Sequence, residues 1–280
     1  MKNVWRDRLA AAAPVVLFVL LLAAAWQLGT TMFRVPHYIF PKLSGVLASL
    51  WDDRAVLGRH FAVTLEESLL GLAISVAFGA PAAAGIEGSR LARRTLYPLL
   101  VASQTVPIVA LSPIMVMWFG YELWSKVAVV TLFTFFPVAI NTADGLRAAD
   151  AEIGELMRSM GAGRRALFLK WKLPSALPGF FTGLKLAAAI SVGGATLGEW
   201  LGGEAGLGVY TKRASNLLRG EDVFAGVLLL SAMGIGLFLA AAALERLALA
   251  GRPDAGFRGE KLARRAVRLR LPPADPSARG

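Results

Sequence analysis

Cysteine is absent from this chain of 280 residues, and histidine occurs only twice, as His37 and His60. The lack of cysteine excludes disulfides, thiolate metal sites and cysteine nucleophiles. Two isolated histidines do not form the ligand cluster that a zinc ion requires. We therefore expect a chain that is not an enzyme and that binds no metal or other cofactor.

Acidic residues are also scarce: 19 Asp and Glu stand against 30 Lys and Arg, which gives a net charge of +11. Basic proteins often bind nucleic acid, but here the cations lie between apolar runs and not on one polar face. Hydrophobic residues make up 56% of the chain, which is high for a water-soluble domain. The composition predicts a protein embedded in the lipid bilayer, with basic loops and no nucleic-acid partner.

Six apolar segments approach or exceed the length of about 20 residues that crosses the hydrocarbon core. They are residues 9–33, 68–86, 95–121, 127–143, 180–200 and 223–244. The first segment is longer than the apolar core of a signal peptide, so we expect a retained membrane anchor. The sequence therefore predicts an all-α polytopic membrane protein with six transmembrane helices.

The distribution of Lys and Arg predicts the orientation. If the N-terminus is cytoplasmic, the most basic loops are cytoplasmic too, as the positive-inside rule requires, and so is the C-terminus. We expect three parts. Residues 1–60 hold the first helix and a short interfacial helix, residues 61–250 form the core with a cytoplasmic loop at 145–178, and residues 251–280 form a basic disordered tail.

The loop at 145–178 contains a polar helical hairpin. Asp150 is placed to cap a helix that runs to about Met160, because its carboxylate can accept from free backbone N–H groups. Gly161 supplies the positive φ that ends this helix and turns the chain. We therefore expect a sharp reversal in the middle of the loop.

A second short helix is expected from Arg164 to about Lys172. It presents Leu167, Phe168 and Trp171 on one face between cations. Leu173–Pro174 is expected to end it, because proline disfavours helical geometry in the residue before it. This composition suits an apolar knob that docks on a cytoplasmic partner, but it also suits an amphipathic helix that lies on the inner leaflet.

The spacing of Glu155, Gly161 and Leu173–Pro174 resembles the E-A-A-x3-G-x9-I-x-L-P signature of ABC-importer permeases. Leu156, Met157 and Trp171 replace the two alanines and the isoleucine. The resemblance covers about residues 41–246, implies the type I ABC importer (MetI-like) permease fold and favours docking over membrane-surface binding. The implied docking residues for an ATPase are Glu155, Gly161, Arg164, Leu167, Phe168, Trp171, Leu173 and Pro174.

The resemblance also implies the partners. Cytoplasmic ABC ATPase subunits would bind ATP, because this chain has no phosphate-binding loop and its nearest approach, residues 179–185, has the wrong spacing. An extracytoplasmic solute-binding protein would deliver the cargo. A second permease copy, most simply an identical one, would complete the assembly in the bacterial inner membrane.

Polar residues in or beside the predicted spans are candidates for the translocation path. Prolines in these spans free backbone carbonyls, which are tolerated where neighbouring helices or a watery cavity satisfy them. Hydrogen bonds between helices explain such residues equally well, and an acid at the end of a span can also lie in the interface. The candidates are Ser103, Gln104, Thr105, Asn141, Lys185 and Glu199.

The segments 105–137 and 198–208 resemble the permease branch that serves nitrate, sulfonates, taurine and thiamine-pyrimidine or riboflavin-type solutes. We expect a thiamine-pyrimidine precursor or a similar small heterocycle, with nitrate, sulfonate or taurine as the alternative. A self-sufficient secondary transporter is a further alternative, but it calls for ionisable residues deep in the membrane and an inverted repeat. Only Lys185 is so placed, and no repeat is evident.

Overall fold

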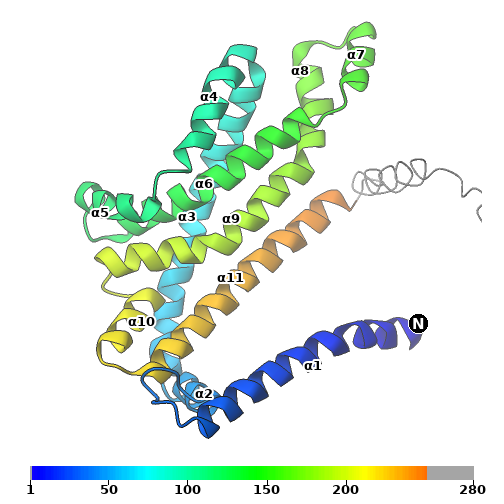
Figure 1. The fold of residues 1–280 in the computed structure, drawn as a ribbon. Coiled ribbons are helices and arrows are strands. Elements are labelled where there is room, and N and C mark those ends of the chain that lie inside the picture. The colour runs from blue at the N-terminus through cyan, green and yellow to red at the C-terminus, as the bar shows by residue number, and fades with distance from the viewer. Residues whose placement is uncertain (1, 251–280) are drawn as a thin grey trace, which may run out of the picture. The chain divides into compact units, whose positions relative to one another are not determined.

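The computed structural model describes the backbone of residues 2–250 and the side chains of residues 13, 14 and 16–250. Every regular element among these residues is a helix, which confirms the predicted all-α class (Figure 1). The chain divides into two units, Met1–Ala242 and Ala243–Gly280, and each is described by itself. The tail predicted at residues 251–280 lies outside the described residues.

The described helices follow one another with short connections. In chain order they are α1 (Lys2–Met32), α2 (Leu43–Asp52), α3 (Arg54–Gly88), α4 (Arg90–Ser103), α5 (Ile108–Phe119), α6 (Leu123–Arg147), α7 (Ala151–Ser159), α8 (Arg164–Leu167), the π-helical segment η1 (Phe168–Lys172), α9 (Leu173–Gly202), α10 (Leu207–Asn216) and α11 (Gly220–Leu249).

Four helical runs in the described chain are long and apolar enough to cross a membrane: α3, α6, the run Arg164–Gly202 and α11. A fifth crossing results if α4 and α5 count as one span. α1 contributes a shorter apolar stretch, Val16–Met32. By length and composition, the described helices give four or five membrane spans, so the predicted number of six is not confirmed.

The third predicted span, residues 95–121, is not one straight helix. It consists of α4 and α5, which meet at an angle of 93°. Between them, the N–H groups of Gln104, Thr105 and Val106 bond to carbonyls only three residues back, at 3.0–3.2 Å. Pro107 has no N–H to continue the helix and disfavours helical geometry in the residue before it, so the chain bends here.

The core of the membrane region is the packing of α6 against α9, with α3 beside them (Figure 1). Glycines bring the backbones of α6 and α9 into direct contact. A Cβ atom on Gly179 would lie 2.6 Å from the carbonyl oxygen of Asn141, and one on Gly145 would lie 2.8 Å from that of Ala176. Small residues give the same close approach in other membrane helix pairs.

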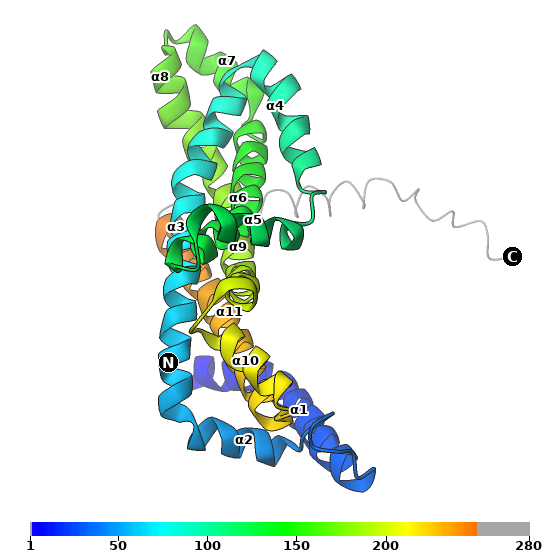
Figure 2. The same cartoon turned by 90° about the vertical axis from the view of Figure 1, so that its left-hand side faces the viewer.

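The short helix predicted before the second span is confirmed as α2, which lies between the ends of α1 and α3 in Figure 2. Trp26 of α1 fixes this region, because its Nε1 donates to the carbonyl oxygen of Pro41 at 2.9 Å. The indole also packs against Phe40 and Phe224, with ring centroids 5.4 and 5.7 Å away. α1 and the first turns of α11 are thereby joined around one aromatic cluster.

Candidate functional site

The helical hairpin predicted at 145–178 projects from one end of the α3–α6–α9 bundle, and α10 and α2 lie at the other end (Figures 1 and 2). Asp150 caps α7 as predicted, because its Oδ1 accepts from the N–H of Glu152 at 2.9 Å. Gly161 has a φ of +82° and reverses the chain after α7. The first half of the hairpin therefore follows from the local sequence.

The second half of the hairpin differs from the prediction, because Leu173–Pro174 does not end a helix. α8 passes through η1 directly into α9, and the N–H of Leu173 bonds to the carbonyl oxygen of Phe168 five residues back. This wider turn lets Pro174 enter at the first turn of α9, where its missing N–H does little harm. Residues Arg164–Gly202 consequently form one helical run.

Trp171 also lies elsewhere than on the exposed face that the sequence predicts. Its side chain is only 9% exposed and packs against Gly154 of α7. A Cβ atom on Gly154 would lie 2.5 Å from Cη2 of the indole, so only glycine leaves room for the ring at this distance. Leu167 and Phe168 are half-buried. Trp171 therefore joins the two arms of the hairpin to each other.

The exposed apolar surface of the hairpin belongs mainly to α7. Ile153, Leu156 and Met160 follow one another at helical spacing, and Leu156 and Met160 are 62% and 78% exposed. Glu155 and Arg164 are exposed as well. We call Ile153, Leu156 and Met160 the α7 stripe, and it can take part in a contact outside the chain.

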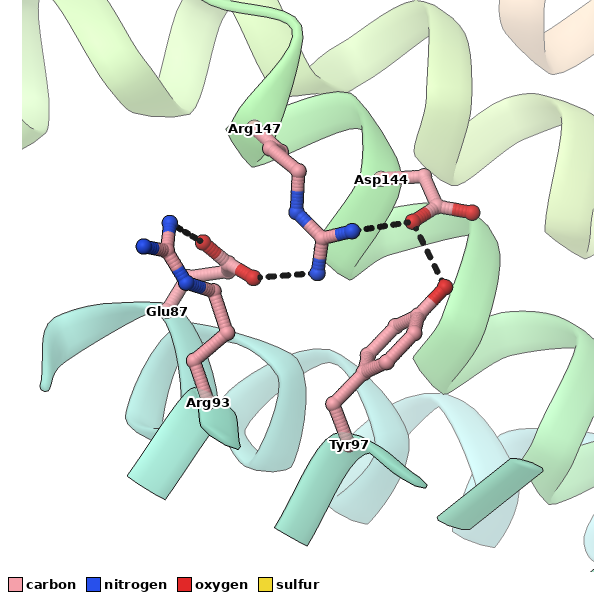
Figure 3. A network of polar contacts seen from close by, with 5 residues as sticks. All are labelled: Glu87, Arg93, Tyr97, Asp144 and Arg147. Atoms are coloured by element: carbon pink, nitrogen blue, oxygen red, sulfur yellow. Dashed lines mark hydrogen bonds and ion pairs between the residues drawn. The ribbon is translucent and has the colours of Figure 1, made fainter. Parts of the chain in front are cut away.

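A polar network ties α3, α4 and α6 together at the base of the hairpin (Figure 3). The buried carboxylate of Glu87 accepts from Arg147 at 2.9 Å and from Arg93 at 3.5 Å. Asp144 accepts from the hydroxyl of Tyr97 at 2.9 Å and lies 3.7 Å from Nη1 of Arg147. The network fixes the ends of three helices relative to one another.

Sequence reasoning missed this network, although one signal was present. Glu87 is the only acid between residues 68 and 121, and it stands just before the basic segment Arg90–Arg94. A lone carboxylate at the end of an apolar helix needs a cationic partner, because a buried unpaired charge is unfavourable by several kcal/mol. Which cations pair with it depends on the packing of α6 against α3, which the sequence alone does not show.

Glu199 lies at the far end of the bundle and is 1% exposed. Its Oε1 accepts from the hydroxyl of Thr64 at 2.6 Å. Its Oε2 accepts from the N–H groups of Gly208 and Val209, the latter at 3.3 Å. The carboxylate thus satisfies free N–H groups in the first turn of α10, where the helix dipole also favours negative charge.

Two further side chains of α3 complete this cap. The N–H of Leu207 donates to the hydroxyl of Thr64 at 2.8 Å, and the N–H of Gly206 donates to Nδ1 of His60 at 2.9 Å. Glu67 is buried beside them, and its Oε2 has no hydrogen-bond partner. The spacing of His60, Thr64 and Glu67 places all three on one helix face, and this spacing is the signal in the sequence that could have predicted the cap.

Tyr210 links α10 to the junction between α2 and α3 near the same end. Its hydroxyl donates to Oδ2 of Asp53 at 3.0 Å, and burial together with Asp53 and Asp222 raises the pKa of the phenol. Tyr210 therefore remains a neutral donor.

No group of three or more His, Cys, Asp or Glu in the described part of the chain could hold a metal ion.

The predicted path residues lie on several different elements. Ser103 and Thr105 donate to backbone carbonyls at the α4–α5 bend, and Gln104 is exposed there. Asn141 donates to the carbonyl oxygen of Pro137 at 2.8 Å, within α6. Lys185 is half-buried on α9. The hydrogen bonds of Ser103, Thr105 and Asn141 thus run to backbone carbonyls of their own segments.

Comparisons with known proteins agree with this architecture. Residues 75–249 match the family model described as binding-protein-dependent transport system inner membrane component. The chain is 40% identical to the formylaminopyrimidine transport permease protein ThiX of Halalkalibacterium halodurans, over 84% of this chain and 94% of the relative. It is 30% identical to the putative aliphatic sulfonates transport permease protein SsuC of Escherichia coli, over 83% and 89%.

Among solved structures, a chain of the inward-facing MetNI methionine ABC transporter superimposes with a TM-score of 0.62. It is 19% identical and covers 70% of this chain and 97% of its own length, so it supports the fold alone. The chain therefore belongs to the binding-protein-dependent permease family. It is a non-catalytic, membrane-spanning subunit of an ABC importer, and the family implies ATPase and binding-protein partners.

Proposed function

We propose that this chain is the permease of an importer for a thiamine-pyrimidine precursor or a similar small heterocycle. The observation that carries the proposal is the 40% identity, over most of both chains, to a permease named for formylaminopyrimidine transport. A riboflavin transport permease of Chloroflexus aurantiacus, 33% identical, is also named for a heterocycle. Sulfonate or taurine import is the second candidate, supported by the relative named for aliphatic sulfonates.

We further propose that the hairpin docks on a cytoplasmic ATPase subunit. The predicted docking residues divide into three groups in this proposal. Glu155 and Arg164 lie on the exposed surface, whereas Trp171 holds the arms together and Gly161 turns the chain. The α7 stripe supplies the apolar contact. Leu167, Phe168, Leu173 and Pro174 shape the arm that leads into α9.

The mechanism follows from the connections of the hairpin. We propose that two copies of the chain place two hairpins on two ATPase subunits, with both chain termini in the cytoplasm. ATP-driven closure of the ATPases moves the hairpins and tilts the attached helices α6 and α9, which switches the bundle between two states. A separate extracytoplasmic protein delivers the solute.

The solute assignment is tested by reconstituting the chain with its ATPase and binding protein in vesicles. Uptake of labelled formylaminopyrimidine is expected to depend on ATP and to exceed uptake of taurine under the same conditions. Vesicles that lack the ATPase are the control, because a secondary transporter would still accumulate solute. Taurine uptake at the higher rate would transfer the proposal to the second candidate.

The docking surface is tested by replacing Leu156 with aspartate in the α7 stripe. Loss of one apolar anchor that is buried in an interface is expected to weaken ATPase binding roughly 30-fold, which corresponds to about 2 kcal/mol. Binding of the purified ATPase to the permease in nanodiscs measures the change. Leu217→Asp is the matched control, because Leu217 is similarly exposed but lies after α10 at the other end of the bundle. Equal affinities for the two variants would contradict docking through α7.

A further inference from the structure

A cavity of about 470 Å³ lies beside the Glu87 network. Its walls come from the α3–α4 turn, the end of α6 and both arms of the hairpin. Five cationic side chains line it: Arg90, Arg93, Arg147, Arg158 and Lys172. Only two acids, Glu87 and Glu155, lie in the same wall. The cavity therefore carries an excess of positive charge.

Most of this excess is not neutralised within the protein. Glu87 already pairs with Arg93 and Arg147. In the part of the chain that the structure describes, none of Arg90, Arg158 and Lys172 forms an ion pair. Three unpaired cations around one cavity repel one another, and a bound anion removes this repulsion.

Trp171 gives a second and independent indication of a missing ligand. It lines the cavity, and its buried Nε1–H has no acceptor among the described residues. Buried polar groups in folded proteins almost always have a hydrogen-bond partner. The unpartnered Nε1–H of Trp171 therefore indicates that a ligand in the cavity supplies the acceptor. The N-terminus of α4, at Arg90, also reaches the cavity and favours an anion.

The position of the cavity indicates the source of the anion. It lies where the membrane-spanning helices α3 and α6 end and where α9 begins, which is the level of lipid headgroups. Beyond the lining residues Arg90 and Arg93, α4 also exposes Leu91, Leu96 and Leu99. A cationic cavity at this level, on a helix that also exposes apolar side chains, fits a molecule with an anionic head and apolar chains.

We propose that this cavity binds the phosphate group of an anionic phospholipid headgroup, with the acyl chains along α4. Arg158, Trp171 and Lys172 belong to the hairpin, whereas Arg90 and Arg93 belong to the bundle. A bound phosphate therefore joins the hairpin to the bundle. The binding of lipid does not depend on which solute the importer carries. Only the consequence for transport of joining the hairpin to the bundle rests on the proposed docking of the hairpin on an ATPase.

The test uses the purified full-length chain and native mass spectrometry with equal amounts of phosphatidylglycerol and phosphatidylcholine. Wild type is expected to retain phosphatidylglycerol selectively, and Arg90→Gln or Arg158→Gln each to weaken its binding about fivefold. Arg94→Gln is the matched control, because Arg94 is an exposed cation of the same helix that does not line the cavity. This control is expected to bind lipid like wild type.

A second readout follows Trp171 itself. In a chain labelled with fluorotryptophan, the resonance that Trp171→Phe removes is expected to shift when short-chain phosphatidylglycerol is added, and not when phosphatidylcholine is added. The same shift with inorganic phosphate alone would overturn the lipid assignment in favour of a free anion. Equal loss of lipid in Arg94→Gln would show general surface attraction and overturn the site. A shift that appears only with the ATPase subunit would assign the cavity to a protein carboxylate.

Discussion

Gly154→Ala is expected to lower solute-stimulated ATP hydrolysis about tenfold, because overpacking of this kind destabilises a structure by about 1–3 kcal/mol. The added methyl group would lie within 2.5–2.9 Å of three atoms of the Trp171 indole, which is enclosed and cannot move away freely. The two arms of the hairpin would separate, while membrane insertion would be retained. ATP turnover of the reconstituted complex, with and without loaded binding protein, measures the effect.

Two companion variants make this prediction specific. Gly163→Ala is the control in the same hairpin, since nothing lies within 4 Å of a Cβ at Gly163 and its φ of −71° suits alanine. It is expected to behave like wild type. Trp171→Leu in the Gly154→Ala background is expected to restore part of the activity, because the smaller side chain leaves room for the methyl group. A fully active Gly154→Ala variant would contradict the contact, and so would a loss of activity that Trp171→Leu does not relieve.

Glu199→Ala is expected to lower the stability of the purified chain by about 3 kcal/mol, because it leaves two buried donors without an acceptor. The N–H groups of Gly208 and Val209 lose their partner, and the hydroxyl of Thr64 keeps only the carbonyl oxygen of His60, at 3.2 Å. The start of α10 should loosen, and transport should fall with it. Thermal unfolding in detergent and uptake in vesicles are the two measurements.

Glu204→Ala serves as the matched control for Glu199→Ala. Glu204 lies five residues after Glu199, in the connection between α9 and α10, but it is exposed, and the hydrogen bond from Arg213 goes to its backbone carbonyl oxygen at 3.1 Å. Its removal is expected to leave the unfolding temperature unchanged. If both variants unfold at the wild-type temperature, Glu199 does not hold the cap that the structure shows.

Features that depend on near neighbours in sequence could be predicted. The Asp150 cap, the turn at Gly161 and the short helix α2 each follow from residues within one or two turns. The expectation that proline ends a helix was wrong at Pro174, because a π-helical turn accommodates the proline and the helix continues. Local prediction failed also for residues 95–121, where several prolines were recognised but the 93° bend was not.

Features that depend on distant residues could not be predicted. Trp171 has the apolar character of a docking residue, and only Gly154 on the other arm explains why it is buried. Glu199 was recognised as unusual, but its partner Thr64 is 135 residues away. The sequence shows that these two residues are unusual, but their partners come from packing: of the two hairpin arms for Trp171, and of α3 against α9 for Glu199.

The uninterrupted helical run Arg164–Gly202 can transmit movement from the hairpin to the far end of the bundle. Its 39 residues, at a rise of about 1.5 Å each, give a rod of roughly 60 Å. One end forms an arm of the hairpin, and Glu199 lies three residues before the other end. Pivoting such a rod by about 5° at its middle displaces each tip by roughly 2–3 Å in opposite directions. The hydrogen bonds of Glu199 to Thr64 of α3 and to Val209 of α10 are 2.6 and 3.3 Å long, so a displacement of this size is enough to break them.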